Sequence, residues 1–244
     1  MVYNNEYNRK LYSISVMKNI LILGSSAGMG IEKSFKEVFP NIQDSNITNL
    51  SGNGAGNFYI AGRLFEYISH NKKPDYIFFK FTGLNRWDLP FDQKVSLDDY
   101  QYQTNSKLTK WVFSGGYSGS WLTNNILKKI FCYIYDVKDQ NKTNNQSMQQ
   151  IFSCISLCET LKINYNWTFY YDITNPPSKS SGEDGFIEKL PSYISTKKML
   201  DFTPLNYSYD INEAPEDGNH YEKSTFTKYL KEKKIYNKIK ESLK

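Results

Sequence analysis

Apolar residues along the chain occur in short runs with two different spacings. Four runs are rich in apolar and aromatic residues and are typical of buried strands: 19–23, 47–50, 75–81 and 166–172. Five segments repeat apolar residues with helical spacing: 31–39, 58–69, 123–137, 146–161 and 224–233. Pro40 ends the first predicted helix, and a serine caps the last one. The pattern therefore predicts strands and helices in alternation.

This alternation predicts the fold class. Strands joined through helices pair in parallel, and the helices cover both faces of the sheet. The chain is thus predicted to be an α/β protein with three layers, α/β/α, around a mostly parallel sheet. Ligands of such proteins bind beyond the carboxyl ends of the strands. The loops that follow the strands are therefore the first candidates for a functional site.

The length of the chain predicts one domain. Its 244 residues are enough for one full α/β core and too few for two complete domains. Met17-Lys18-Asn19-Ile20 is typical of the start of a first strand, so we assign the domain to residues 17–234. Residues 1–16 are predicted to be an extension, and residues 235–244 a basic C-terminal tail.

The nearly balanced charge argues against a nucleic-acid partner, and the short apolar runs argue against insertion in a membrane. The chain has 30 Lys and Arg against 25 Asp and Glu, and its basic residues cluster only at 228–244, which is typical of a solvated helix face. The apolar run at 20–23 is too short for a signal peptide, and no stretch approaches the roughly 20 apolar residues that span a bilayer. We therefore expect a soluble, cytoplasmic protein.

The three cysteines do not predict a disulfide or a zinc site. Cys132, Cys154 and Cys158 are odd in number, and the last two lie one helical turn apart in an apolar segment. This arrangement is typical of buried thiols. No metal and no organic cofactor is expected.

Residues with complementary chemistry follow the predicted strands. Ser26 comes after the first strand, a glycine-rich stretch at 51–57 after the second, and Asn85 after the third. Asp217 and His220 precede the last helix. A serine nucleophile, small residues with free backbone donors, a side-chain amide and a histidine beside a carboxylate are what acyl transfer through an oxyanion requires.

The first loop has a glycine and serine motif. It reads Gly24-Ser25-Ser26-Ala27-Gly28-Met29-Gly30, which matches the block Gly-Asp-Ser-x-x-x-Gly except that Ser25 stands in place of Asp. The next loop has Asn49 five residues before Gly54.

Two further motifs complete the set. Gly83-Leu84-Asn85 matches a Gly-x-Asn-Asp block, with Arg86 in place of the Asp, and Asp217-x-x-His220 is the last. With all four in this order, the chain resembles the SGNH (GDSL-like) hydrolase family from about residue 17 to 230. The runs 54–60 and 82–86 are similar to a branch found in phage and marine bacterial genomes. A virion-associated location is therefore a second expectation.

The resemblance implies the flavodoxin-like form of the three-layer fold and a specific set of roles. Ser26 would be the nucleophile, His220 its general base, and Asp217 the carboxylate that orients the histidine. The oxyanion would be held by the backbone N–H groups of Ser26 and Gly54 and by the side chain of Asn85.

The same reading suggests a substrate. We expect a serine esterase that removes a small acyl group, such as acetyl, from a carbohydrate or another small molecule. Arg86, Trp87 and Tyr117 are candidates for lining the substrate site, and Tyr117, Trp111 and Trp121 for a lid over it. His70 is predicted to end a helix and to have no catalytic role.

Two alternatives stay open. The replacements at Ser25 and Arg86 are compatible with a glycan-binding or virion-associated module with little turnover. Gly24, Gly28 and Gly30, with Tyr193 and Lys197, also fit the glycine pattern and the Tyr-Lys pair of short-chain dehydrogenases, although Tyr193 lies in a region rich in Pro, Ser and Gly, where that family has a helix. The oligomeric state is not predicted.

Overall fold

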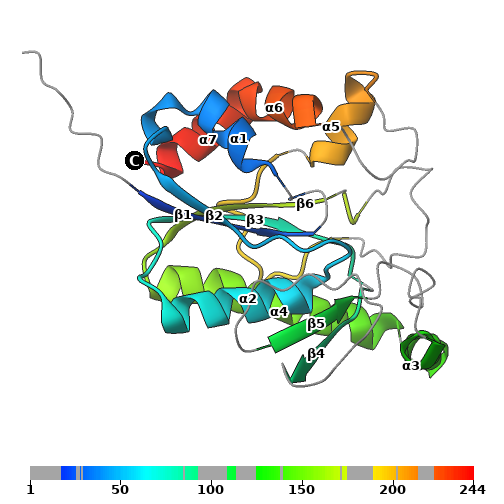
Figure 1. Ribbon diagram of the computed structural model, residues 1–244. Coiled ribbons are helices and arrows are strands. Elements are labelled where there is room, and N and C mark those ends of the chain that lie inside the picture. Colours follow the sequence, from blue (N-terminus) through cyan, green and yellow to red (C-terminus); the bar gives the residue numbers. More distant parts are fainter. Residues whose placement is uncertain are drawn as a thin grey trace, which may run out of the picture.

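A parallel sheet forms the centre of the protein (Figure 1). The computed structural model describes residues 18–25, 28, 30–84, 86–92, 109–113, 125–137, 140–170, 172–174, 189–201, 203–213 and 223–244. Within them, the sheet consists of β1 (Asn19–Gly24), β2 (Asn46–Asn49), β3 (Tyr76–Phe81) and β6 (Asn164–Phe169), in the order β2-β1-β3-β6. All three pairings are parallel, and the order matches the start of the flavodoxin-like order 2-1-3-4-5. The predicted α/β class is confirmed.

The central strands are buried on both faces, which explains their continuous apolar runs. Ile22 of β1 and Phe78 of β3 pair in register and belong to one apolar cluster, whereas Leu23 and Phe79 belong to the cluster on the other face. Every residue of β3 is buried. β2 is an edge strand, and its residues are exposed or half-buried.

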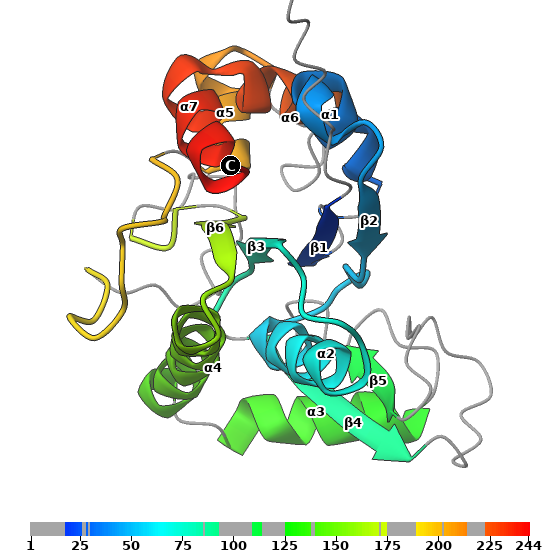
Figure 2. The same cartoon turned by 90° about the vertical axis from the view of Figure 1, so that its left-hand side faces the viewer.

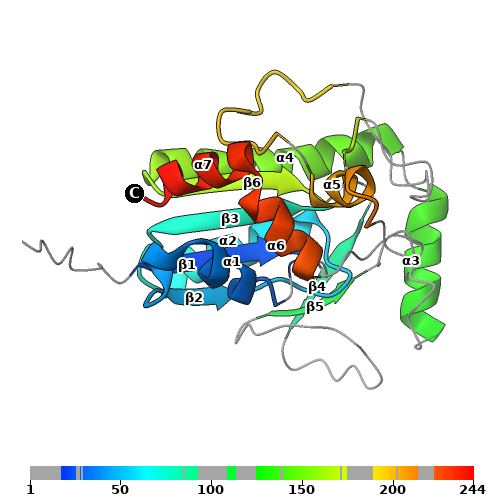
Figure 3. The same ribbon diagram turned by 90° about the horizontal axis from the view of Figure 1, so that it is seen from above.

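Two layers of helices cover the sheet (Figure 2). On one face lie α2 (Asn57–His70) and α4 (Gln140–Thr160); on the other lie α1 (Glu32–Val38), α5 (Pro204–Asp210), α6 (Lys223–Lys231) and α7 (Lys233–Ser242). A short 3-10 helix, η2 (Pro40–Ile42), follows α1, and α3 (Asn125–Val137) lies beyond the carboxyl ends of the strands (Figure 3). The nine elements predicted from the sequence are all present, with shifted ends.

A β-hairpin that was not predicted packs against α2. Its strands are β4 (Asp88–Asp92) and β5 (Thr109–Phe113). The ring of Trp111 lies edge-on against Tyr59, with 5.6 Å between the centroids. A Cβ added to Gly62 would lie 2.6 Å from the Trp111 ring, so α2 needs glycine there. The lid prediction for Trp111 is wrong, because this side chain is buried against a helix.

The C-terminal residues were also predicted incorrectly. Residues 235–244 do not form a tail, because most of them lie in α7. Ile235, Ile239 and Leu243 are buried in the apolar cluster that covers one face of the sheet. The basic residues of α7 occupy its solvated side, so the helix is amphipathic and the core extends to Leu243.

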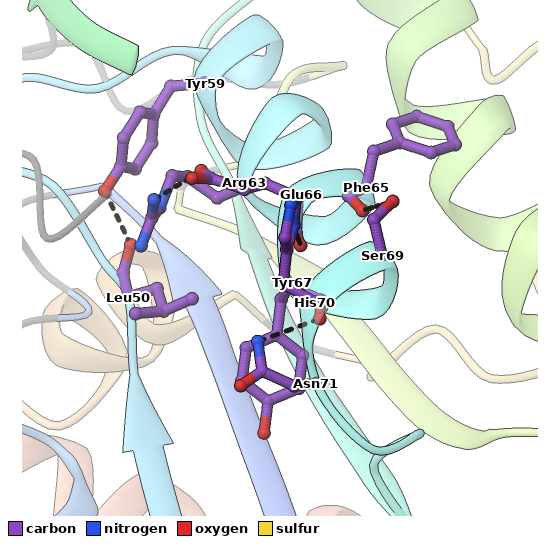
Figure 4. A network of polar contacts seen from close by, with 9 residues as sticks. All are labelled: Leu50, Tyr59, Arg63, Phe65, Glu66, Tyr67, Ser69, His70 and Asn71. Atoms are coloured by element: carbon purple, nitrogen blue, oxygen red, sulfur yellow. Dashed lines mark hydrogen bonds and ion pairs between the residues drawn. The ribbon is translucent and has the colours of Figure 1, made fainter. Parts of the chain in front are cut away.

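Polar contacts along α2 place the first histidine far from the loops of interest (Figure 4). The Tyr59 hydroxyl donates to the carbonyl of Leu50 (2.9 Å), and Arg63 pairs with Glu66 (2.6 Å). Burial raises the pKa of Tyr59 to about 12. His70 is the last residue of α2, and its Nδ1 lies 2.9 Å from the Glu66 carbonyl. Because α2 returns the chain from the end of β2 to the start of β3, His70 lies at the amino edge of the sheet.

The thiols of α4 follow the prediction. Cys154 and Cys158 are free and buried. Burial raises the pKa of both, to about 12 for Cys158.

Of the helices in the described residues, none combines the length and apolar character needed to cross a membrane.

We predict that Ile239→Ala lowers the free energy of unfolding by about 2 to 5 kcal/mol, because it removes buried methyl groups and leaves a cavity. Urea unfolding followed by circular dichroism measures this difference. Asn237→Ala, at an exposed position of the same helix, is the control and should change the value by less than about 0.5 kcal/mol. Equal stability of the two variants would show that α7 does not contribute to the core.

Candidate active site

The loops that follow β1, β2 and β3 meet at the carboxyl edge of the sheet (Figure 3). We call them the first rim loop (24–30), the second rim loop (50–56) and the third rim loop (82–88). Parallel pairing places all three at the same edge. The residues within them decide what this edge can bind.

Asn49 connects the first and second rim loops. Its side-chain amide donates to the carbonyl of Gly28 (2.8 Å) and to Glu32 of α1 (2.9 Å), and its oxygen accepts from Ser51 N (3.0 Å). Gly52 N donates to the carbonyl of Gly24 (3.0 Å). The first rim loop is therefore held from the side by β2 and the loop that follows it.

Space in the first rim loop is limited by Ser51. A Cβ at Gly28 would lie 2.5 Å from the Ser51 hydroxyl oxygen, which is buried and for which the described residues offer no hydrogen-bond partner. Ser25 is also buried. Ser25 and Gly28 flank Ser26, so the residues around the predicted nucleophile are closely packed on the β2 side.

Gly54 lies at the turn of the second rim loop. Its φ of +74° is in the left-handed region, where glycine is favoured over residues with a Cβ. No hydrogen bond to its backbone N–H is found within the part of the chain that the structure describes. Gly54 is half-buried.

Asn57 connects the second rim loop to the third. It is the first residue of α2 and is fully buried. Its side-chain amide donates to the Thr82 carbonyl (3.2 Å) and the Ser147 hydroxyl (2.8 Å), while its oxygen accepts from Thr82 N (3.0 Å). One side chain thus satisfies both backbone groups of Thr82, which has left the strand ladder.

Asp88 makes a second connection between these loops. Its two carboxylate oxygens accept from Gly56 N and Tyr59 N, both at 2.8 Å. Burial raises the pKa of Asp88 from 3.8 to about 7, although both backbone bonds and the nearby charge of Arg86 act in the opposite direction. The carboxylate is the N-terminal cap of α2, supplied by a strand distant in sequence.

Arg86 and Trp87, which we predicted to line a substrate site, contact the start of α2. Trp87 stacks on Phe58 with parallel rings 5.9 Å apart. The Cβ and carbonyl of Arg86 lie next to Gly56. Both side chains are half-buried, so part of each remains accessible at the rim.

The start of α6 lies beside the first rim loop. The Lys223 ammonium would be 2.7 Å from a Cβ on Gly30, whose φ is +71°. Farther along, Thr227 donates to Ser34 of α1 (2.9 Å). Because Lys223 is three residues after His220, the end of the segment that contains the predicted histidine is anchored at this loop.

A buried amine lies below the rim. Lys80 of β3 is fully buried next to Gly24 and Thr168, with its nitrogen 5.1 Å from the centre of the Tyr170 ring and 5.6 Å from that of Phe226. Burial lowers the pKa of Lys80 well below its usual range. The lysine therefore places an ionisable group in the buried layer between β3 and α6.

A cavity of about 240 Å³ lies beside the carboxyl end of β6. Its apolar wall includes Phe169, Ile173 and Leu200, and its polar groups include Asp172 and Asn206.

Among the described residues, no three His, Cys, Asp or Glu side chains are grouped as metal ligands would be.

Six predicted site residues lie outside the described residues: Ser26, Asn85, Tyr117, Trp121, Asp217 and His220. Their described neighbours do come together: the first, second and third rim loops and the start of α6 share the carboxyl edge. Asn57, Lys80 and Asp88 were not predicted. A charged residue within the apolar strand 76–81 was the available signal for Lys80, whereas the partners of Asn57 and Asp88 are distant in sequence.

The dehydrogenase alternative does not agree with the structure. In the dinucleotide-binding order 3-2-1-4, β1 lies between β2 and the fourth strand, whereas here it lies between β2 and β3. Tyr193 and Lys197 are in turns instead of a helix, and Tyr193 is 47% exposed. This Tyr-Lys pair therefore lacks the helix on which that family presents it.

The chain was compared with protein families, curated proteins and solved structures. No protein-family model and no curated protein matches the chain. A solved structure that does match is the psychrotrophic esterase EstA from Pseudoalteromonas sp., inhibited by monoethylphosphonate, at 14% identity over 93% of this chain and 98% of that chain, with a TM-score of 0.47. At this level of likeness, function has to be inferred from the residues of the rim.

We predict that Asp88 makes stability depend on pH. Its pKa is higher in the folded than in the unfolded chain, so between about pH 4 and 7 the folded protein binds more protons and becomes less stable as pH rises. The difference in unfolding free energy between wild type and Asp88→Asn should therefore fall by roughly 2 to 3 kcal/mol from pH 5 to pH 8. Urea titrations at several pH values measure it. A constant difference would mean that Asp88 does not titrate in this range.

Proposed function

We propose that the protein is a serine ester hydrolase whose active site lies at the rim, as the resemblance to SGNH hydrolases implies. The observation that carries the proposal is the contact between Lys223, at the start of α6, and Gly30. His220 is three residues before Lys223, and three residues span at most about 11 Å. Ser26 is four residues before Gly30, so the contact supports the proposal that both residues contribute to one site.

The proposed reaction uses covalent catalysis. The Ser26 hydroxyl attacks the acyl carbon while His220 takes its proton, and the resulting imidazolium then protonates the departing alcohol oxygen. Water attacks the acyl-enzyme by the same route and releases the acid. Asp217 orients the His220 ring and stabilises its charged form.

The oxyanion of each tetrahedral intermediate would be held by three donors: the N–H groups of Ser26 and Gly54 and the side chain of Asn85. The positive φ of Gly54 supports its role, as does the absence of a partner for its N–H among the described residues. The links through Asn57 support a fixed distance between the second and third rim loops, from which Gly54 and Asn85 come. Preorganised donors lower the barrier because they need no rearrangement during the reaction.

The proposed substrate is a small O-acyl ester of a carbohydrate or another polar molecule. The cavity beside β6 has apolar walls and polar groups that accept and donate hydrogen bonds, which suits a hydroxylated group with a short acyl chain. Arg86 and Trp87 remain candidates to contact the substrate, with Tyr117 as a third.

We predict that Ser26→Ala abolishes hydrolysis of p-nitrophenyl acetate and labelling by a fluorophosphonate, because it removes the nucleophile. Mass spectrometry of the labelled wild-type chain should locate the label on Ser26. Ser153→Ala, at a half-buried serine of α4, is the control and should keep full activity. Labelling or loss of activity at Ser25 instead would overturn the assignment of Ser26, and glycan binding without any serine-dependent turnover would support a binding module.

We predict that Asn85→Ala lowers kcat by roughly 100- to 1,000-fold with little change in KM, since it removes a donor that acts mainly on the transition state. Steady-state kinetics on the same ester measures both constants. An unchanged kcat in a folded variant would contradict the assignment of Asn85 to the oxyanion hole.

A further inference from the structure

Asp88 joins two loops that the proposed reaction needs to hold together. It is the first residue of β4, and its side chain is almost completely buried. Each carboxylate oxygen accepts one backbone N–H of the α2 terminus, Gly56 N and Tyr59 N, both at 2.8 Å. Rotation of the carboxylate would break one or both bonds, so this contact fixes orientation as well as distance.

The contact is reinforced on both sides. Trp87, next to Asp88 in sequence, stacks on Phe58, which lies between the two bonded amides. A Cβ on Gly56 would lie 2.8 Å from Asp88 Oδ2 and 3.0 Å from the Cβ of Arg86, so the third rim loop and the helix terminus are in close contact. The end of the third rim loop and the first turn of α2 therefore form one packed unit.

The charges around Asp88 favour its carboxylate form in part. Arg86, on its own loop, is the nearest cation that acts on it, and the α2 terminus contributes the positive end of its dipole. From α2, the Tyr59 hydroxyl also faces it, and Arg63 is the charged neighbour of that hydroxyl. Burial opposes these effects, so the bonds to Gly56 and Tyr59 are what compensate the carboxylate at this position.

We propose that Asp88 is a positioning residue for the oxyanion hole. Gly54 is two residues before Gly56, and Asn85 is three residues before Asp88. By fixing the α2 terminus against the third rim loop, Asp88 holds the two donors at the separation that one oxyanion requires. The proposal rests on the proposed function, because it assigns Asp88 a role in that site.

The test compares Asp88→Asn with a matched control. Asn keeps the size of the side chain but can accept only one of the two bonds. Asp75→Asn is the same substitution at the opposite edge of the sheet, where Asp75 Oδ2 accepts a single backbone bond, from Asn19 N at 2.8 Å, which the Asn oxygen can still accept. Kinetics on p-nitrophenyl acetate and hydrogen exchange by mass spectrometry are measured on both full-length variants.

We expect Asp88→Asn to lower kcat roughly 10- to 100-fold with KM nearly unchanged, less than the loss of a whole donor. Exchange should become faster at the amides of residues 56–60 and nowhere else in α2. Asp75→Asn should change neither kcat nor the exchange of this segment. Asp88→Ala, which removes both acceptors, should enlarge both effects if it folds.

Two results would overturn the proposal. If exchange at 56–60 becomes faster while kcat is unchanged, Asp88 is only a structural cap. If exchange is unchanged, the carboxylate does not fix the helix terminus at all. Absence of any Ser26-dependent turnover in the wild type is a separate outcome: it would refute the proposed function, while the exchange data would still decide whether Asp88 fixes the loop.

Discussion

The three rim loops are subject to a constraint that applies wherever the strands of a sheet end. Beyond the last ladder pair, backbone N–H and C=O groups lose their strand partners, and a buried group without a partner costs about 1 to 3 kcal/mol. Asn49 and Asn57 satisfy such groups at the carboxyl edge, and Asp88 satisfies amides of the α2 terminus, which lack partners within the helix. Each side chain bonds to the backbone of a different segment, so satisfying the groups also fixes the loops relative to one another.

This arrangement makes α2 the central element of the candidate site. Its first residue, Asn57, is bonded to the end of β3, its terminal amides are bonded to Asp88, and Phe58 and Tyr59 contact tryptophans of the hairpin region. The hairpin thus has a physical role that its position away from the sheet does not suggest: it brings a carboxylate to the helix terminus. The resemblance to SGNH hydrolases placed a carboxylate at position 86, and the chain has one two residues later.

Electrostatics differ on the two sides of the rim. On the α2 side, a buried carboxylate is compensated by backbone donors and by the helix dipole. On the α6 side, the buried Lys80 lies beneath the start of the first rim loop, and burial lowers its pKa. Asp88 and Lys80 are both buried ionisable residues, and both lie next to the loops at the carboxyl edge of the sheet. Such placements are common where a protein tunes a functional site.

The sequence by itself determined the fold class, the order of the strands and helices, and which loops would share an edge. These follow from local periodicity and from the rule that strands joined through helices pair in parallel, so apolar spacing at 75–81 or 58–69 was sufficient. It also predicted the buried thiols of Cys154 and Cys158 correctly. The roles of Ser26, Gly54, Asn85, Asp217 and His220 stay predictions.

Only the tertiary structure decided the hairpin, the packing of α7 and the partners of Asn57 and Asp88. The hairpin strands are short and carry no strong alternation, and a run of lysines concealed the buried side of α7. The bonds of Asp88 join residues 29 and 32 positions apart, and those of Asn57 to Thr82 and Ser147 span 25 and 90. No local pattern encodes such contacts, because they exist only when folding brings the two loops to the same edge.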